Sequence, residues 1–368
     1  MKNLHTFLQR KNVIITFRRY GIDALGAMAQ GLFCTLLVGT ILNTLGQQLN
    51  IPFLNEIIVT LKQGDQLIGY TVGGLASALV GPGIAVAIGF ALQAPPLVLF
   101  SLIVVGFAAN AMGGAGGPLA VYVVAILACE SGKLVSKETK IDILVTPIVT
   151  ILLGTAAASL IAAPIGAAAS AVGDFVRWAT VLQPFWMGIL VSAVIGITLT
   201  LPISSAAICA ALGLTGLAGG AAVAGCCAQM VGFAVMSFRE NRWGGLIAQG
   251  VGTSMLQMPN IVKNPKIWIP PILTSMITGP LATCLFKLEM NGSAVSSGMG
   301  TCGLVGQIGV YTGWLADIAS GAKVAITAGD WIGLTLICFL LPGILSLVFC
   351  GILRRIGWIE DGDLALDL

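Results

Sequence analysis

Residues 66–129 read QLIGYTVGGLASALVGPGIAVAIGFALQAPPLVLFSLIVVGFAANAMGGAGGPLAVYVVAILAC and contain no Asp, Glu, Lys or Arg. Since one crossing of a bilayer takes about 20 apolar residues, this stretch is long enough for more than one crossing. Transmembrane β-strands would instead alternate apolar and polar residues in segments of about ten. Other uncharged stretches are 24–55, 143–173, 178–238, 243–262, 267–286, 290–316 and 331–353. The sequence therefore predicts an all-α polytopic membrane protein with about ten transmembrane helices, some of them re-entrant or broken.

The composition excludes several classes of protein. Of 368 residues, 57% are hydrophobic and 9% are charged, against roughly 25% charged residues in an ordinary soluble domain. So few charges cannot cover the water-exposed surface of a globule of this size. A soluble enzyme, a nucleic-acid-binding protein and a disordered scaffold are all excluded.

The basic residues predict the topology. Under the positive-inside rule, loops rich in Lys and Arg face the cytoplasm. Both termini are then cytoplasmic, and the number of full crossings is even. We expect a cytoplasmic basic arm at 1–20, a single transmembrane domain at 21–357, and a short acidic, solvated cytoplasmic tail at 358–368. The basic residues used are Lys2, Arg10, Lys11, Arg18, Arg19, Lys133, Lys137, Lys140, Arg239, Arg242, Arg354 and Arg355.

The cysteines and the histidine carry no recognisable chemistry. Nine cysteines lie in apolar segments without a Cys-x-x-Cys pair, and His5 is the one histidine. Cysteine packed in lipid serves as a small hydrophobe. We therefore expect no disulfide framework, no metal site, no cofactor and no catalytic residue in this chain.

Two glycine-rich clusters predict interruptions of the helices. The first is 113–117, and the second is the Ser- and Thr-rich stretch 292–309. Glycine costs a helix about 1 kcal/mol per residue relative to alanine, and unwound backbone at membrane depth occurs where it lines a cavity or is buried in protein. Such broken segments build binding sites in transporters; the alternative is that both clusters are extramembrane loops. The glycines of 213–225 instead indicate close packing of helices, and the likeness of 95–106 to 270–279 is consistent with an internal repeat.

Polar side chains near these clusters form the predicted substrate site. A carboxylate accepts hydrogen bonds from neighbouring hydroxyls, and amides and hydroxyls recognise a neutral polyol without the cost of burying a charge. The alternatives are that Glu289 pairs with Lys287 at the membrane interface, and that the uncharged residues link helices. The predicted substrate-binding residues are Glu289, Asn291, Asn110, Gln257, Asn260, Thr301 and Gln307.

Residues 252–271 and 298–307 resemble a family of bacterial membrane proteins. Their sequences are GTSMLQMPNIVKNPKIWIPP and GMGTCGLVGQ. The family is that of the phosphotransferase-system EIIC-like permeases, in particular the stand-alone branch with the perfringolysin-regulator-like proteins. The resemblance implies a sugar permease subunit of the bacterial cytoplasmic membrane that forms a homodimer. It also implies a sugar-binding Glu, for which Glu289 is the nearest match by context, and separate EIIA and EIIB partner proteins for phosphoryl transfer.

Two functions from different classes follow. The first is a permease that translocates a small polar solute, a carbohydrate, across the cytoplasmic membrane. The alternative is a membrane sensor or regulator that keeps the EIIC-like fold without coupling to phosphoryl transfer. An ion- or proton-coupled transporter is disfavoured because the membrane-embedded acids are few.

Overall fold

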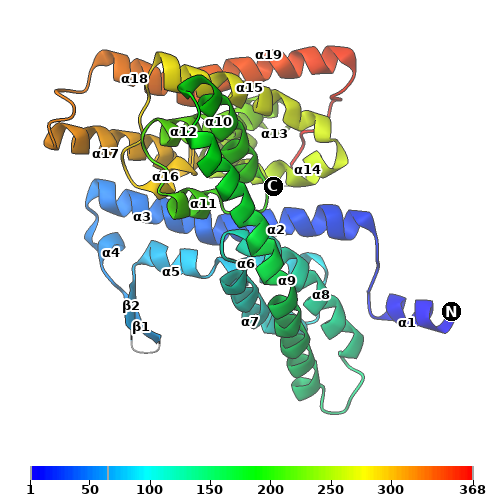
Figure 1. Cartoon of the computed structure of the whole chain (residues 1–368). Coiled ribbons are helices and arrows are strands. Elements are labelled where there is room, and N and C mark those ends of the chain that lie inside the picture. Colours follow the sequence, from blue (N-terminus) through cyan, green and yellow to red (C-terminus); the bar gives the residue numbers. More distant parts are fainter. Residues whose placement is uncertain (1, 64–65, 367–368) are drawn as a thin grey trace. The chain divides into compact units, whose positions relative to one another are not determined.

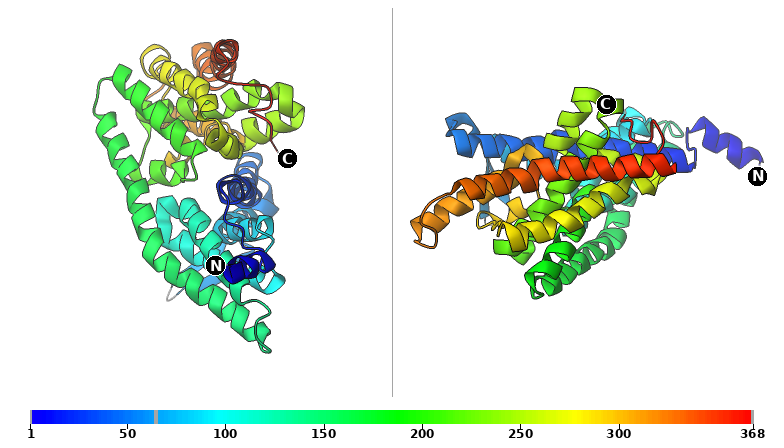
Figure 2. Two further views of the ribbon diagram at one scale, coloured as in Figure 1. Left: turned by 90° about the vertical axis from the view of Figure 1, so that its right-hand side faces the viewer. Right: turned by 90° about the horizontal axis from the view of Figure 1, so that it is seen from above.

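The computed structural model describes residues 2–63 and 66–366, and most of these are helical (Figure 1). The chain divides into two compact units, Met1–Ala168 and Ala169–Leu368. The long helix α9 (Asp142–Thr180) begins in the first unit and ends in the second (Figures 1 and 2). Each unit has its own set of packed helices and is described by itself.

The first unit combines α-helices with short π and 3-10 helices and one pair of strands. A bent pair of helices, α5 and α6, turns by 56° at its break. The elements are α1 (Lys2–Arg10), η1 (Arg19–Asp23), α2 (Ala24–Leu32), η2 (Phe33–Leu37), α3 (Val38–Leu49), α4 (Pro52–Asn55), β1 (Val59–Gln63), β2 (Gln66–Tyr70), α5 (Val72–Ala78), α6 (Val80–Ala91), α7 (Pro96–Gly113), η3 (Gly114–Gly116) and α8 (Gly117–Val135), followed by α9.

A two-stranded hairpin corrects the prediction that the fold is entirely helical. Strands β1 and β2 pair antiparallel, from Val59 opposite Tyr70 to Gln63 opposite Gln66. The four consecutive β-branched residues at 57–60 favour a strand, because their side chains are stiff and suit a pleated surface. The fold is therefore nearly all-α.

The glycine-rich cluster at 113–117 does interrupt a helix. Gly114 has φ +52° and ψ −124°, which is a conformation suited to glycine. Helices α7 and α8 on either side pack against each other. The cluster is therefore the turn of a helical hairpin.

The second unit is built around α12 (Gly216–Met236), which is almost fully buried. Helices α10, α15 and α19 pack against it. The other elements are α10 (Pro184–Thr200), α11 (Ser205–Leu212), α13 (Phe238–Ile247), η4 (Ala248–Gly252), η5 (Ser254–Gln257), α14 (Met258–Lys263), η6 (Pro265–Trp268), α15 (Ile269–Pro280), η7 (Leu281–Leu285), α16 (Ala294–Ser297), η8 (Cys302–Leu304), α17 (Val305–Ala319), α18 (Ala328–Thr335), η9 (Leu336–Leu340) and α19 (Leu341–Ile356).

Glycines on α12 allow neighbouring backbone to approach it closely. A Cβ atom at Gly220 would lie 1.7 Å from the carbonyl oxygen of Leu288, and one at Gly225 would lie 1.9 Å from that of Ser192. These positions therefore need glycine for space. The close helix packing predicted for 213–225 is confirmed at Gly225, which faces Ser192 of α10, whereas Gly220 faces a loop residue.

Six segments are long and apolar enough to cross a membrane, or seven if the bent pair α5–α6 counts as one span, among the described residues. The prediction of about ten spans is not confirmed. It treated most uncharged runs as crossings, whereas 178–238 and 243–262 contain short pieces such as the eight-residue α11 and the irregular η4 and η5. The six segments are Arg19–Gln47, Pro96–Val135, Asp142–Thr180, Gly216–Met236, Pro265–Leu285 and Ala328–Ile356.

The described part of the C-terminal tail, residues 358–366, has both buried and exposed side chains. Residues 358–366 lie packed on the second unit, and the side chains of Ile359 and Leu364 are 2% and 0% exposed. The tail was expected to be solvated because of its acidic residues. Glu360 and Asp361 are indeed exposed, whereas Ile359 and Leu364 are buried; residues 367–368 of the predicted tail lie outside the described residues.

Candidate functional site

The structure distributes the seven predicted residues over both units. Asn110 belongs to the first unit, where its side chain lies beside Gly117 in the α7–α8 turn. The other six belong to the second unit, in three separate polar groups. We describe these groups in turn.

The first group lies on a loop without helix, residues 286–293, which we call the Glu289 loop. Met290 exchanges two backbone hydrogen bonds with Gly216 at the start of α12, each of 3.0 Å. Gly216 has φ +65°, the left-handed region that favours glycine. The loop is therefore fixed in place by main-chain bonds, and the predicted interruption near Asn291 is present.

Asn291 joins two carboxylates in this loop. Its Nδ2 donates hydrogen bonds to Oε2 of Glu289 at 3.2 Å and to Oδ2 of Asp317 at 2.9 Å. Glu289 is exposed, and the other two residues are partly buried. We call these three residues the carboxylate cluster; it offers several acceptor oxygens and an amide to a solute.

Asp317 was missed by the sequence analysis. It lies on α17, 26 positions after Asn291, and it ends the uncharged stretch 290–316. A carboxylate that closes such a stretch is costly in an apolar setting and is a signal of function. That signal was available, but the fold is what places the residue beside Asn291.

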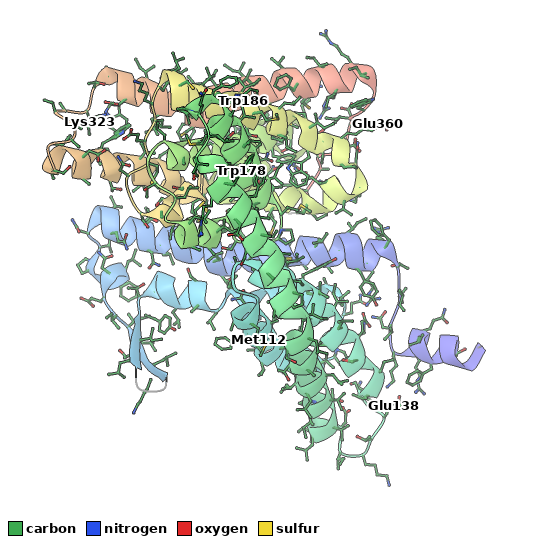
Figure 3. The ribbon with its side chains drawn as sticks, viewed as in Figure 1. Met112, Glu138, Trp178, Trp186, Lys323 and Glu360 are labelled. Carbon is green, nitrogen blue, oxygen red and sulfur yellow. The ribbon has the colours of Figure 1, made fainter. Side chains whose placement is uncertain are left out.

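Aromatic rings lie next to the carboxylate cluster. The backbone N–H of Lys323 donates to the carbonyl of Asp317 at 3.1 Å, and its Nζ lies 5.4 Å from the ring centroid of Trp314 (Figure 3). Trp314 packs edge-to-face on Trp331 at 5.5 Å, and Trp331 is 48% exposed. Lys323 also forms an ion pair of 2.6 Å with Asp330. The surroundings of the cluster thus combine charge with an exposed indole.

A small cavity lies beside residues 212–218, the segment whose Gly216 pairs with Met290 of the Glu289 loop. Its volume is about 170 Å³, and it is lined by residues of 212–218 with Arg177 and Thr180 of α9. The same segment accepts a hydrogen bond of 2.6 Å from Ser297 Oγ at the carbonyl of Leu214. Residues 212–218 therefore line the cavity and, through Gly216, also hold the loop that carries Glu289 and Asn291.

The second group contains Gln257 and Asn260. Asn260 Nδ2 donates to Gln257 Oε1 at 2.9 Å, and Gln257 Nε2 donates to Gln249 Oε1 at 2.9 Å. Both side chains also donate to the C-terminal tail, at the carbonyls of Leu364 and Ala365. Their polar atoms have partners within the protein.

The third group is buried against α12. The Thr301 hydroxyl lies 3.6 Å from the sulfur of Met230, and Gln307 Nε2 lies 3.1 Å from the sulfur of Cys227. The Oε1 atom of Gln307 is buried without a hydrogen-bond partner. These two residues face the core of the unit.

The described residues contain no cluster of three or more His, Cys, Asp or Glu side chains suited to a metal ion.

Outside the spans, the pKa of the Glu138 carboxyl is lowered, first because Lys11 donates a hydrogen bond to it and then because the Arg10 guanidinium lies 2.7 Å away. Glu138 is labelled in Figure 3. The basic arm is thereby attached to the loop after α8. No predicted site residue takes part in this contact.

Residues 22–366 match the family model of the phosphotransferase system EIIC. The chain belongs to the EIIC family. It is therefore a multi-pass membrane component of the phosphotransferase type, as the sequence resemblance implied. Comparisons with curated proteins and with solved structures gave no match.

Proposed function

We propose that this EIIC protein carries a small polar solute, a carbohydrate, across the bacterial cytoplasmic membrane. The observation that carries the proposal is the carboxylate cluster on an irregular loop of the second unit. Irregular backbone that supplies polar groups is the usual structure of a transporter site. Family membership supports the transport role, and the cluster supports the class of solute.

The chemistry of the carboxylate cluster suits a carbohydrate. The carboxylates of Glu289 and Asp317 accept hydrogen bonds from hydroxyl groups, and such bonds to a charged group are stronger than neutral ones. The Oδ1 atom of Asn291 can accept a further hydrogen bond, while its Nδ2 donates to the two carboxylates. The exposed Trp331 packs on Trp314, which lies three residues before Asp317 on α17, and offers an apolar face. A neutral solute with adjacent hydroxyls would satisfy these groups without adding charge.

The proposal includes the arrangement of the whole protein. Both termini are cytoplasmic, because the basic segments lie there under the positive-inside rule. The protein works as a homodimer with separate EIIA- and EIIB-type proteins, which receive and deliver the phosphoryl group. This chain supplies the pathway for the solute.

The test begins with a thermal-shift screen of the purified protein against sugars, polyols and carboxylates. Binding of the selected compound is then measured for the parent and for Glu289→Ala. We expect the affinity to fall about ten- to 150-fold, which corresponds to 1.5–3 kcal/mol for a hydrogen bond to a charged group. Asp317→Asn should weaken binding as well.

The matched control is Glu56→Ala, which removes another exposed carboxylate in the first unit. It should bind like the parent. If Glu289→Ala melts and binds like the parent, the carboxylate cluster is not the substrate site. If only carboxylates shift the melting temperature, the solute class is wrong.

A further inference from the structure

Four amide side chains hold the main chain of the C-terminal tail. We call them the amide cluster: Asn241, Gln257, Asn260 and Asn264. Their amide groups donate to four main-chain contacts: Asn241 to the Leu364 carbonyl at 2.8 Å, Gln257 to the same carbonyl at 3.0 Å, Asn260 to that of Ala365 at 2.7 Å, and Asn264 to that of Trp358 at 3.0 Å. Recognition through main-chain carbonyls is the way proteins bind a segment of polypeptide.

The Asn241 side chain both donates a hydrogen bond to the tail main chain and accepts one from it. Besides donating to Leu364, its Oδ1 accepts a hydrogen bond of 2.8 Å from the N–H of Leu366. A side-chain amide that donates to the carbonyl of residue 364 and accepts from the N–H of residue 366 makes the same hydrogen bonds as the main chain of a neighbouring β-strand would. This contact is a built site and not a chance approach of a surface residue.

Side chains make most of the contacts that hold the described part of the tail; the main-chain bond from the Trp358 N–H to the Leu353 carbonyl, at 2.9 Å, joins its first residue to α19. Residues 358–366 form turns and belong to no helix or sheet. Arg354 at the end of α19 forms ion pairs with Asp361 at 2.5 Å and with Glu240 at 2.6 Å, and the Asp361 side chain is 91% exposed. Glu360, the tail residue before Asp361, is labelled in Figure 3. Exposed ion pairs contribute about 1 kcal/mol or less. The tail can therefore leave without unfolding any regular element.

The amide cluster also joins the tail to an irregular part of the second unit. Gln257 ends η5, Asn260 lies in α14, and Asn264 follows α14. Gln249 of η4 donates to Ser237 Oγ, just after α12, at 2.8 Å. The hydrogen bonds thus run without interruption from α12 through segment 248–264 to the tail. Segment 248–264 consists of three short helices of different kinds, η4, η5 and α14, of which the longest has six residues.

We infer that the amide cluster is a binding site for extended polypeptide main chain, that its ligand is this chain's own residues 358–366, and that the bound tail is a releasable latch on segment 248–264. The inference rests on the contacts of the second unit and is independent of the carbohydrate proposal. When the tail leaves, the amides lose their partners and segment 248–264 gains freedom to move.

The first experiment measures release of the tail in the full chain. Leu364→Cys and Ala365→Cys are compared for their rates of reaction with a soluble maleimide, in a background with the exposed Cys34 and Cys284 replaced by Ser. Position 364 is buried and position 365 is exposed. We expect the buried cysteine to react at least tenfold more slowly, and equal rates would show that the tail is not docked.

Adding Asn241→Ala should speed the reaction at 364 about 25-fold, since two ordinary hydrogen bonds are lost and each corresponds to roughly fivefold. The control is Asn55→Ala, which removes an amide-to-carbonyl bond of 2.7 Å in the first unit and should leave the rate unchanged. A synthetic peptide of residues 358–368 at millimolar concentration should also speed the reaction, because it competes with a tethered ligand. A scrambled peptide should not; if both peptides act alike or neither does, the binding site is disproved.

The second experiment tests the latch. Asn264→Cys and Asp363→Cys are joined by a short thiol cross-linker, since these side chains form a hydrogen bond of 2.7 Å in the parent. Hydrogen exchange of the 248–264 amides should be slower in the cross-linked chain than in the uncross-linked chain, with no change in α7 and α8. Equal exchange in the two forms would mean that the tail does not control this segment, and the latch would be refuted even if the peptide binds.

Discussion

Replacing Gly220 by alanine should damage the second unit through one contact. The new Cβ would lie 1.7 Å from the carbonyl oxygen of Leu288, so this oxygen must move at least 1.3 Å to reach 3.0 Å. Leu288 is two residues from Met290, which exchanges both of its main-chain hydrogen bonds with Gly216. The substitution therefore pushes the Glu289 loop away from the start of α12.

The cost has two parts. Overpacking of a well-packed core costs about 1–3 kcal/mol, and loss of two hydrogen bonds adds about 0.5–1.5 kcal/mol each. The total is about 2–6 kcal/mol. For a unit of this size we expect the melting temperature to fall by at least about 4 °C, as measured by thermal unfolding of the purified protein in detergent.

The matched control is Gly351→Ala. Gly351 is an exposed residue of α19, and a Cβ there would meet nothing within 4 Å. Because alanine favours a helix over glycine, this variant should melt at or slightly above the parent temperature. A Gly220→Ala protein that melts within a degree of the parent would show that the loop moves freely, and the account of its fixed position would be refuted.

Three further results are expected. Gly114→Ala should lower the stability of the first unit by about 1–3 kcal/mol, measured by melting, because its φ of +52° strains alanine although no atom lies within 4 Å. The pKa of Glu138 is lowered by Lys11, so this contact should stabilise the protein fully above the ordinary value of about 4.3 and be lost as the pH falls through the lowered value. The melting temperatures of the parent and Glu138→Gln should accordingly differ at pH 7 and converge as the pH falls through the lowered pKa of Glu138, and a constant difference would contradict the assignment. Reporter fusions after residues 12, 136 and 357 should all be cytoplasmic, and a periplasmic signal at any of them would overturn the topology.

The membrane class and the broken helices could be predicted because they depend on local composition. Uncharged runs and dense glycine act through hydrophobicity and helix propensity, which need no knowledge of distant residues. The number of spans could not be obtained in the same way. Whether an apolar run such as 178–238 forms one long helix or several short ones depends on what packs against it.

The candidate site was predictable only in part. Glu289 and Asn291 are neighbours in sequence, so their contact followed from one loop. Asp317 reaches Asn291 from another helix. The main-chain partners of Gln257 and Asn260 lie more than 100 positions later, in a tail whose acidic residues predicted exposure to solvent. Pairing over such distances is decided by the whole fold.

The docked tail has a consequence for the synthesis and folding of the protein. Asn260 is synthesised about a hundred residues before Ala365. At about 5–20 residues per second, the ribosome takes roughly 5–20 s to cover that interval. During this time the amides of segment 248–264 lack their final partners, and the second unit cannot be complete. A stop codon before position 364 would therefore leave the amides of Gln257 and Asn260 without the carbonyls of Leu364 and Ala365.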